Sequence, residues 1–149
     1  MSDSDLIKLY SGRILELAAD IPLTDRLSMP QATVKKRSPL CGSTVTVDIA
    51  TSDGVITDFG QDVKACALGQ AAASVVARHV IGRTKGEIET ARDQLKAMLK
   101  SDGPSPDAPF DELHVLRPAR DFKNRHASIL LALDATADAF SEAEKSACA

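Results

Sequence analysis

Two cysteines and one histidine are the residues of this 149-residue sequence whose types and positions suit sulfur or metal chemistry. Cys41 lies between Pro39 and Gly42 in the run Ser-Pro-Leu-Cys-Gly-Ser. Proline restricts the backbone before it and glycine frees the backbone after it, so the pattern predicts a tight turn that presents the thiol. The alternative interpretation is a small buried side chain, which is the commonest role of a lone cysteine.

Cys66 follows Asp-Val-Lys-Ala and opens a predicted helix. The unpaired N–H groups and the dipole of a helix N-terminus stabilise a thiolate, and the nearby Lys64 adds to this effect. Such a cysteine is a better nucleophile and a better metal ligand. The sequence is equally compatible with a packing patch of small residues, formed by Ala65, Cys66 and Ala67.

His126 lies near the start of the predicted last helix. A lone histidine is more often a surface or hydrogen-bonded residue than a ligand. If His126 converges with Cys41 and Cys66, the three make a ligand set for zinc or an iron–sulfur cluster with one position left open. Spacing alone does not show that convergence. We expect Cys148, in a short polar tail, to be dispensable.

The composition disfavours several other classes of function. The net charge is −3, and the aromatic residues are one Tyr, four Phe and no Trp, which disfavours nucleic-acid binding. No apolar run approaches the roughly 18 residues of a membrane-spanning helix. The first residues are acidic, unlike a signal or transit peptide, so we expect a cytoplasmic protein. Three cysteines, an odd number, argue against a disulfide framework there.

An antiparallel meander is predicted in the middle of the chain. Residues 43–50 alternate between apolar and polar side chains, which is typical of a half-buried strand. A Ser-Asp-Gly turn separates them from a second strand over 55–59, after which Asp-Phe-Gly-Gln is expected to break the pattern. A weaker strand is predicted over 32–36.

Helices are predicted on both sides of this meander. Their ranges are 5–18, 66–81, a third that starts from the capping box Thr84 to Glu87, and 123–143. Residues 101–109 are predicted to form a loop, and 110–122 stay ambiguous. We therefore expect one α+β domain over 1–149, with a core of about 5–143 and a short flexible tail. In it, a small three-stranded antiparallel sheet packs against several helices.

With these motifs in this order, the chain resembles the IscU/SufU-type iron–sulfur assembly proteins, also called the NifU N-terminal family. The shared pattern is a Pro-x-Cys-Gly turn (39–42), a strand hairpin (45–59), and a glycine six residues before Cys66-Ala67. An Ala/Ser-rich helix and the turn 80–84 follow. The long spacer between Cys66 and the last helix is more similar to the SufU branch.

The chain departs from the family pattern at two positions. Ser43 replaces the Asp that usually follows Cys-Gly. At the start of the last helix, the family's third cysteine is replaced within Arg125 to Ser128. Two alignments of this segment are possible, and both leave two cysteines and one histidine.

The resemblance implies a scaffold or carrier that accepts sulfur from a cysteine desulfurase, binds iron or an iron–sulfur cluster, and serves recipient apo-proteins. Its implied ligands are Cys41, Cys66 and His126, with Cys41 a possible persulfide acceptor. One alternative is a zinc-bound, sulfurtransferase-like sulfur acceptor, and another is a metal-free adaptor. In each case we expect a scaffold or acceptor rather than a turnover enzyme, as a monomer or weak homo-oligomer. The sulfurs of Cys41 and Cys66 should lie within ~7 Å of each other.

Overall fold

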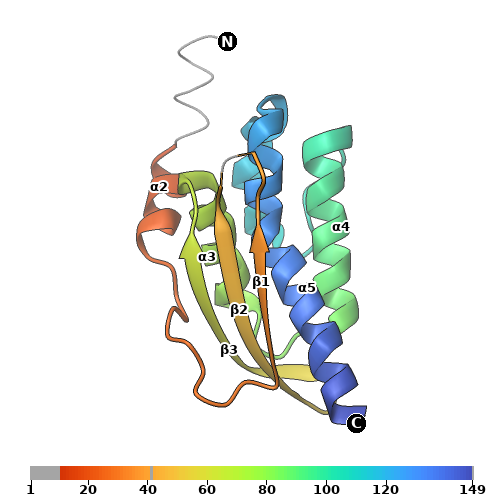
Figure 1. Ribbon diagram of the computed structural model, residues 1–149. Coiled ribbons are helices and arrows are strands. Elements are labelled where there is room, and N and C mark those ends of the chain that lie inside the picture. The colour runs from red at the N-terminus through yellow and green to blue at the C-terminus, as the bar shows by residue number, and fades with distance from the viewer. Residues whose placement is uncertain (1–10, 41, 149) are drawn as a thin grey trace.

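The computed structural model describes residues 11–40 and 42–148 (Figure 1). Its elements follow in the order α2 (Gly12–Ala19), β1 (Ala32–Arg37), β2 (Thr44–Ser52), β3 (Val55–Lys64), α3 (Ala67–His79), α4 (Lys85–Ser101), the 3₁₀ segments η1 (Asp111–Asp121) and η2 (Lys123–Arg125), and α5 (His126–Cys148). The predicted α+β class and three-stranded sheet are confirmed. Residues 5–10 of the predicted first helix lie outside the described residues.

The sheet is an antiparallel meander in the order β1-β2-β3. Val47 of β2 lies opposite Val34 of β1 and Gln61 of β3. The β2–β3 turn contains Asp53 and Gly54, both with positive φ angles (54° and 79°). A Ser-Asp-Gly turn between alternating strands is thus a reliable hairpin signal in this chain.

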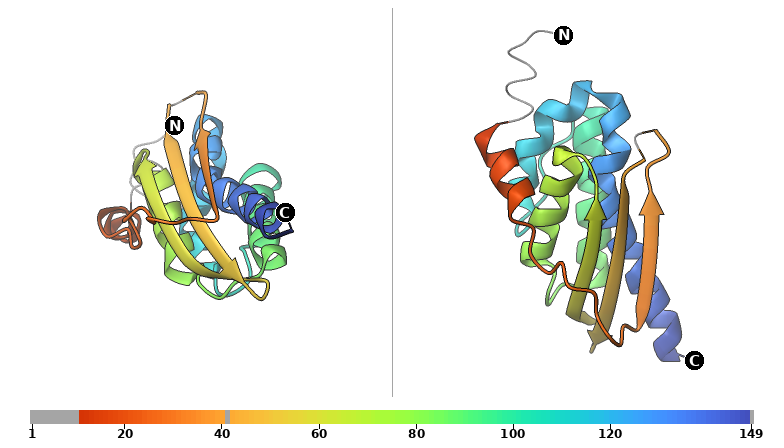
Figure 2. Two further views of the ribbon diagram at one scale, coloured as in Figure 1. Left: turned by 60° about the horizontal axis from the view of Figure 1, so that its bottom comes forward. Right: turned by 60° about the vertical axis from the view of Figure 1, so that its left-hand side comes forward.

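Helices cover one face of the sheet in two layers (Figures 1 and 2). Helix α5 packs against β1, β2 and α3, whereas α4 lies outside it and α2 packs on α3. The side chains of β2 that face the helices, Val45, Val47 and Ile49, are fully buried. The core is aliphatic and alanine-rich, as the scarcity of aromatic residues requires.

Strand β3 is longer than the sequence pattern indicated. It continues to Lys64 rather than ending at Phe59. Gly60 was interpreted as a strand breaker, but it is a point of close approach. A Cβ on Gly60 would clash with the carbonyl oxygen of Asp25 and would lie 3.2 Å from the Leu27 nitrogen. The glycine therefore lets the connector between α2 and β1 cross the strand.

A buried ionic cluster ties this connector to the sheet. Asp48 of β2 is fully buried. Its carboxylate accepts hydrogen bonds from Arg26 (2.5 and 3.0 Å), the Thr33 hydroxyl (2.6 Å) and the Leu27 N–H (3.0 Å). We call these residues the Asp48 cluster. The alternation of β2 placed Asp48 on its polar face, and the connector buries that position by crossing it.

The helices agree with the sequence at most of their ends. The predicted capping box is present at the start of α4: the Thr84 hydroxyl accepts from the Glu87 N–H, and the Glu87 carboxylate accepts from the Thr84 N–H. The ambiguous segment 110–122 is mostly 3₁₀ helix. The C-terminal residues were expected to fray, but α5 continues as helix to Cys148.

None of the helices described is both long enough and apolar enough to cross a membrane.

Candidate functional site

Cys66 occupies the N-cap position of α3. Its backbone is extended (φ −67°, ψ 169°), and its side chain does not cap the helix. The backbone carbonyl of Cys66 accepts the first helical hydrogen bond, from the Gln70 N–H at 2.9 Å. The thiol is half-buried and packs against the edge of the core. This is the position that the sequence predicted for it.

A chain of hydrogen bonds links the Cys66 sulfur to two serines from distant elements. The Cys66 Sγ lies 3.4 Å from the Ser128 Oγ in the first turn of α5. The Ser128 hydroxyl donates to the Ser43 Oγ, 3.0 Å away and just before β2. Both serines are buried. We call Cys66, Ser128 and Ser43 the thiol junction, because it joins α3, α5 and the entry to β2.

Gly69 lets α3 and α5 approach closely enough for this contact. A Cβ on Gly69 would lie 2.6 Å from the Ser128 Oγ and 3.1 Å from the Ser128 carbonyl oxygen. Any side chain there would push the helices apart. The small residue one turn after Cys66 therefore sets the distance between the sulfur and the hydroxyl.

The direction of these hydrogen bonds defines what the thiol junction can do. A hydroxyl has one proton to donate and two lone pairs that accept. Since Ser128 donates its proton to Ser43, it accepts from the Cys66 S–H. If Cys66 loses its proton, rotation of the Ser128 hydroxyl turns that group into a donor to the thiolate. The junction can therefore satisfy either protonation state of Cys66.

Cys41 lies outside the described residues, but those around it form a closed turn. The Ser38 N–H donates to the Ser43 carbonyl (2.8 Å), and the Gly42 N–H donates to the Ser38 carbonyl (2.9 Å). Gly42 has a φ of 70°, a conformation that glycine adopts without strain. The tight turn predicted from Pro39 and Gly42 is thus present, whereas the expected distance between the two sulfurs stays a prediction.

His126 is the first residue of α5. Its side chain is buried, and the ring makes its hydrogen bonds with η1 and not with Cys66. Its Nε2 lies 3.0 Å from the carbonyl oxygens of both Ala119 and Arg120. Carbonyls only accept, so Nε2 carries a proton and Nδ1 is the ring nitrogen that these contacts leave unused. The ring also lines a pocket of about 460 Å³ at the end of α4. Its role as the third ligand stays a prediction.

The residue of α5 that touches Cys66 is Ser128, which the sequence analysis did not select. A serine at a helix start does not by itself indicate a contact with a thiol, because serine is common there as a helix cap. The available signal was Gly69, the one glycine in an otherwise Ala-rich helix.

Within residues 11–40 and 42–148, three or more His, Cys, Asp or Glu side chains nowhere gather closely enough to hold a metal ion.

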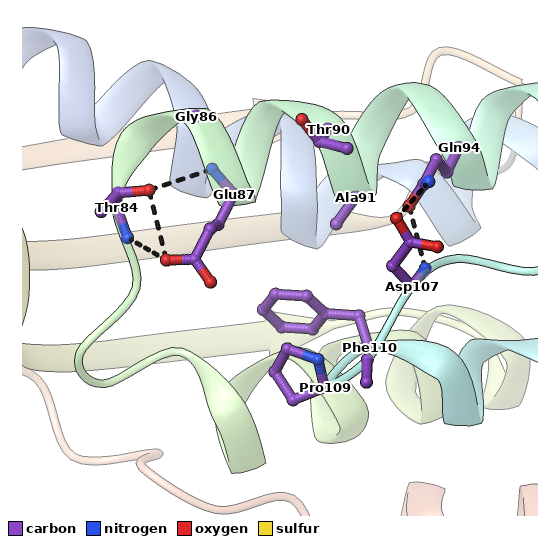
Figure 3. A pocket seen from close by; sticks show the side chains of 10 residues that line it. Thr84, Gly86, Glu87, Thr90, Ala91, Gln94, Asp107, Pro109 and Phe110 are labelled. Atoms are coloured by element: carbon purple, nitrogen blue, oxygen red, sulfur yellow. Dashed lines mark hydrogen bonds between the residues drawn. The ribbon is translucent and has the colours of Figure 1, made fainter.

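A separate pocket of about 390 Å³ lies between α4 and the loop before η1 (Figure 3). Most of its polar side chains are hydrogen-bonded to one another. Glu87 is held by the capping box, and the Gln94 side chain exchanges two 3.0 Å hydrogen bonds with Asp107. Phe110 and Pro109 form the apolar wall. None of the residues that line it belongs to the thiol junction.

Comparison with known proteins identifies relatives across most of the chain. No model of a known protein family matches it. A nitrogen-fixing NifU-like protein (N-terminal) from Brucella abortus has a crystal structure that matches with a TM-score of 0.92 and 48% identity. The match covers 95% of this chain and 98% of that one. The "iron-sulfur cluster assembly scaffold protein IscU" of Thermotoga maritima is 25% identical over 104 residues, which are 70% of this chain and 69% of that protein.

A more distant structure shares the fold. It is a candidate iron–sulfur cluster assembly scaffold protein for the SUF system from Fervidobacterium islandicum AW-1. It matches with a TM-score of 0.80 over 90% of this chain and 98% of that one, at 18% identity. At that level the likeness concerns the arrangement of helices and strands alone.

Proposed function

This chain belongs to the NifU-like N-terminal family, and on that premise we propose that it is an iron–sulfur cluster assembly scaffold. The observation that carries the proposal is the position of Cys66. Its half-buried thiol stands at the N-cap of α3, hydrogen-bonded through Ser128 to Ser43. Ser43 is two residues from Cys41, and two residues of chain span at most about 7 Å. This closeness along the chain supports the proposal that both thiols belong to one site, near the start of β2.

Sulfur is proposed to arrive on Cys41 from a cysteine desulfurase. The Cys41 thiolate attacks the outer sulfur of the desulfurase persulfide, and an S–S bond to Cys41 forms. The S–S bond of the desulfurase breaks, and its cysteine leaves as a thiolate. The residues on either side of Cys41 are held by the Ser38 and Gly42 hydrogen bonds, which supports a role for this turn in meeting the partner.

Iron and the assembled cluster are the cargo of this protein, and recipient apo-proteins take the cluster away. Cys41 and Cys66 are the proposed thiolate ligands, and His126 is the proposed third. With Nε2 held by the Ala119 and Arg120 carbonyls, ligation would use Nδ1. Metal-binding histidines are commonly oriented in this way, with the second nitrogen donating to a carbonyl.

A persulfide acceptor that keeps zinc instead of assembling a cluster is a second candidate function. It is favoured by the two hydroxyls of the thiol junction, which are poor metal ligands: the Ser128 hydroxyl contacts the Cys66 sulfur and donates to Ser43. The SufU-like branch, proposed from the long spacer before α5, is consistent with this second function. A cytoplasmic location and a monomeric or weakly self-associating state complete the proposal.

Anaerobic reconstitution separates these functions. The reduced protein is incubated with ferrous iron, cysteine and a cysteine desulfurase, and bound iron, bound sulfide and visible absorption are measured. We expect the wild type to bind both iron and sulfide, and Cys41→Ala and Cys66→Ala to lose them. Cys148→Ala is the matched control and should retain both.

Three outcomes would revise the proposal. Zinc and a persulfide without bound iron would favour the sulfur acceptor. A wild type that binds neither metal nor sulfur would favour a metal-free adaptor. If His126→Ala and the wild type bind zinc with equal affinity under reducing conditions, His126 is not a ligand of the site. In that last case Ser128→Cys tests whether the start of α5 can provide the missing ligand.

A further inference from the structure

A basic groove is lined by residues of β1, α4 and α5. Figure 1 shows α5 running between the other two elements. Its volume is about 540 Å³. Five basic and two acidic side chains line it. The chain as a whole has a net charge of −3. The basic residues are Lys36, Arg37, Arg92, Lys96 and Lys100. The groove is thus positive on a protein that is negative as a whole.

Three of these residues form a stripe along α4. Arg92, Lys96 and Lys100 are spaced four residues apart, which places them on one face of the helix. Arg92 is paired with its neighbour Asp93 at 3.1 Å. In the part of the chain that the structure describes, neither Lys96 nor Lys100 makes an ion pair. Like charges at this spacing destabilise a helix. The Asp134 carboxylate interacts with Arg92 and Lys96 and offsets part of this repulsion, and a bound anion would offset more of it.

The opposite wall is the outer strand of the sheet. Lys36 of β1 points toward the helices and is paired with Asp138 of α5 at 2.6 Å. Charged residues on an edge strand commonly prevent pairing between sheets. That role accounts for Lys36 and Arg37 but not for the cations of α4 that face them. The half-buried Asp134 is the acidic residue that α5 contributes to the lining.

One end of the groove reaches the turn that carries Cys41. Arg37 ends β1, and its guanidinium lies 4.0 Å from the position of a Cβ on Gly42. Ala127, another lining residue, directly precedes Ser128 of the thiol junction. A segment bound in the groove would therefore bring the rest of its protein to the proposed thiol site.

We propose that this groove binds an acidic segment of a partner protein. The further statement that this partner exchanges sulfur or cluster at the thiols rests on the proposed function, whereas the binding of an acidic segment does not. Charge complementarity favours a short peptide segment over nucleic acid. A long polyanion would extend onto the acidic remainder of the surface, and the sequence has one Tyr and no Trp on which bases could stack.

Fluorescence anisotropy with a labelled peptide of alternating Glu and Ala residues tests the proposal on the reduced, metal-free protein. We expect the peptide to bind, its Gln counterpart not to bind, and the affinity to fall as NaCl rises from roughly 50 to 300 mM. Lys96→Glu/Lys100→Glu should weaken binding by roughly tenfold or more. These side chains are exposed, so the variant should fold, and circular dichroism checks this. Lys96→Gln/Lys100→Gln should weaken binding less.

The control Lys35→Glu/Lys145→Glu carries the same change in net charge. Lys35 points to the opposite face of β1, and Lys145 lies near the end of α5. Equal losses in the two double variants would overturn the proposal, as would equal binding of the Glu and Gln peptides. Displacement by millimolar inorganic phosphate, or tighter binding of a single-stranded oligonucleotide, would replace it with another ligand. Since no iron or sulfide is present, a failure here leaves the scaffold function untouched, and reconstitution tests that function separately.

Discussion

The Asp48 cluster and the thiol junction are both buried polar groups along β2, but different kinds of hydrogen bond hold them. Asp48 is a carboxylate whose partners are a guanidinium, a hydroxyl and a backbone N–H, at 2.5 to 3.0 Å. Cys66 has one neutral partner in the junction, the Ser128 hydroxyl, at 3.4 Å. Hydrogen bonds to ionised groups are roughly twice as strong as neutral ones.

This difference distinguishes a structural cluster from one that suits exchange. Burial opposes ionisation of Asp48, but the hydrogen bonds from Arg26, Thr33 and Leu27 outweigh it and lower the pKa of Asp48 below its ordinary value. The carboxylate therefore stays ionised at neutral pH. The neutral bonds of the thiol junction can be rearranged at little cost, so the Cys66 sulfur can change its proton or its partner.

Removing the Asp48 carboxylate should have the largest effect. Asp48→Ala removes a buried carboxylate that Arg26, Thr33 and Leu27 share as acceptor. Because the Arg26 side chain is half exposed, we expect a loss of about 2–4 kcal/mol in the free energy of unfolding. Urea denaturation measures it. The exposed Asp58→Ala is the control and should change stability by less than about 0.5 kcal/mol. Similar losses in both variants would contradict the conclusion that the hydrogen bonds of the Asp48 cluster are stronger than those of the thiol junction.

A methyl group at Gly69 should have the next largest effect. Gly69→Ala places a Cβ against Ser128, so we expect a loss of about 1–3 kcal/mol. It should also speed the reaction of Cys66 with a thiol reagent. Gly86→Ala in α4, whose Cβ would meet only the Thr84 Oγ1 at an ordinary 4.0 Å, should be neutral or stabilising by about 0.5–1 kcal/mol. A stable Gly69→Ala with unchanged thiol reactivity would contradict the close approach of α3 and α5.

Deleting the hydroxyl of the thiol junction should cost little stability. Ser128→Ala removes two neutral hydrogen bonds, so we expect a loss of about 0.5–1.5 kcal/mol. The alkylation rate of Cys66 should change as a function of pH, because its thiolate loses a donor. Thr136→Ala in the same helix removes a buried hydroxyl that bonds only to a backbone carbonyl, and should leave that pH profile unchanged. Superimposable profiles for all three proteins would exclude a role of Ser128 at the sulfur.

Acid should weaken the Asp48 cluster. Since the folded pKa of Asp48 lies below its ordinary value of 3.8, its contribution is fully present above that value and is lost as the pH falls through the folded pKa. The difference in unfolding free energy between wild type and Asp48→Asn should therefore shrink below about pH 3.8. A difference that grows in acid would reverse the assigned sign.

Local patterns predicted most of the fold. Alternation in β2, the Ser-Asp-Gly turn and the Thr84 capping box each specify structure from neighbouring residues. The errors occurred where distant segments meet. The pattern predicts that the strand ends before Gly60, and the alternation places Asp48 among the polar residues of β2. Neither position carries a local sign that the connector crosses it.

The candidate site could be predicted only in part for the same reason. Cys66 was located correctly, since a helix N-terminus is a local feature. Its contact with Ser128 depends on how closely α3 approaches α5, and no spacing along the chain encodes that distance. The placement of Cys41 lies outside the described residues, and its pairing with Cys66 stays a prediction.

The meander of the sheet has a consequence for the order of folding. Its strands are neighbours in both sequence and space, so their contacts close short loops and can form early. The hydrogen bond between Ser43 and Ser128 joins residues 85 positions apart, and closing so long a loop is slow. We expect the hairpin to form first while the chain is synthesised or refolds. The Cys66 thiol should then stay accessible to solvent until α5 packs against α3. The rate at which Cys66 reacts with a thiol reagent therefore reports on the final step of folding.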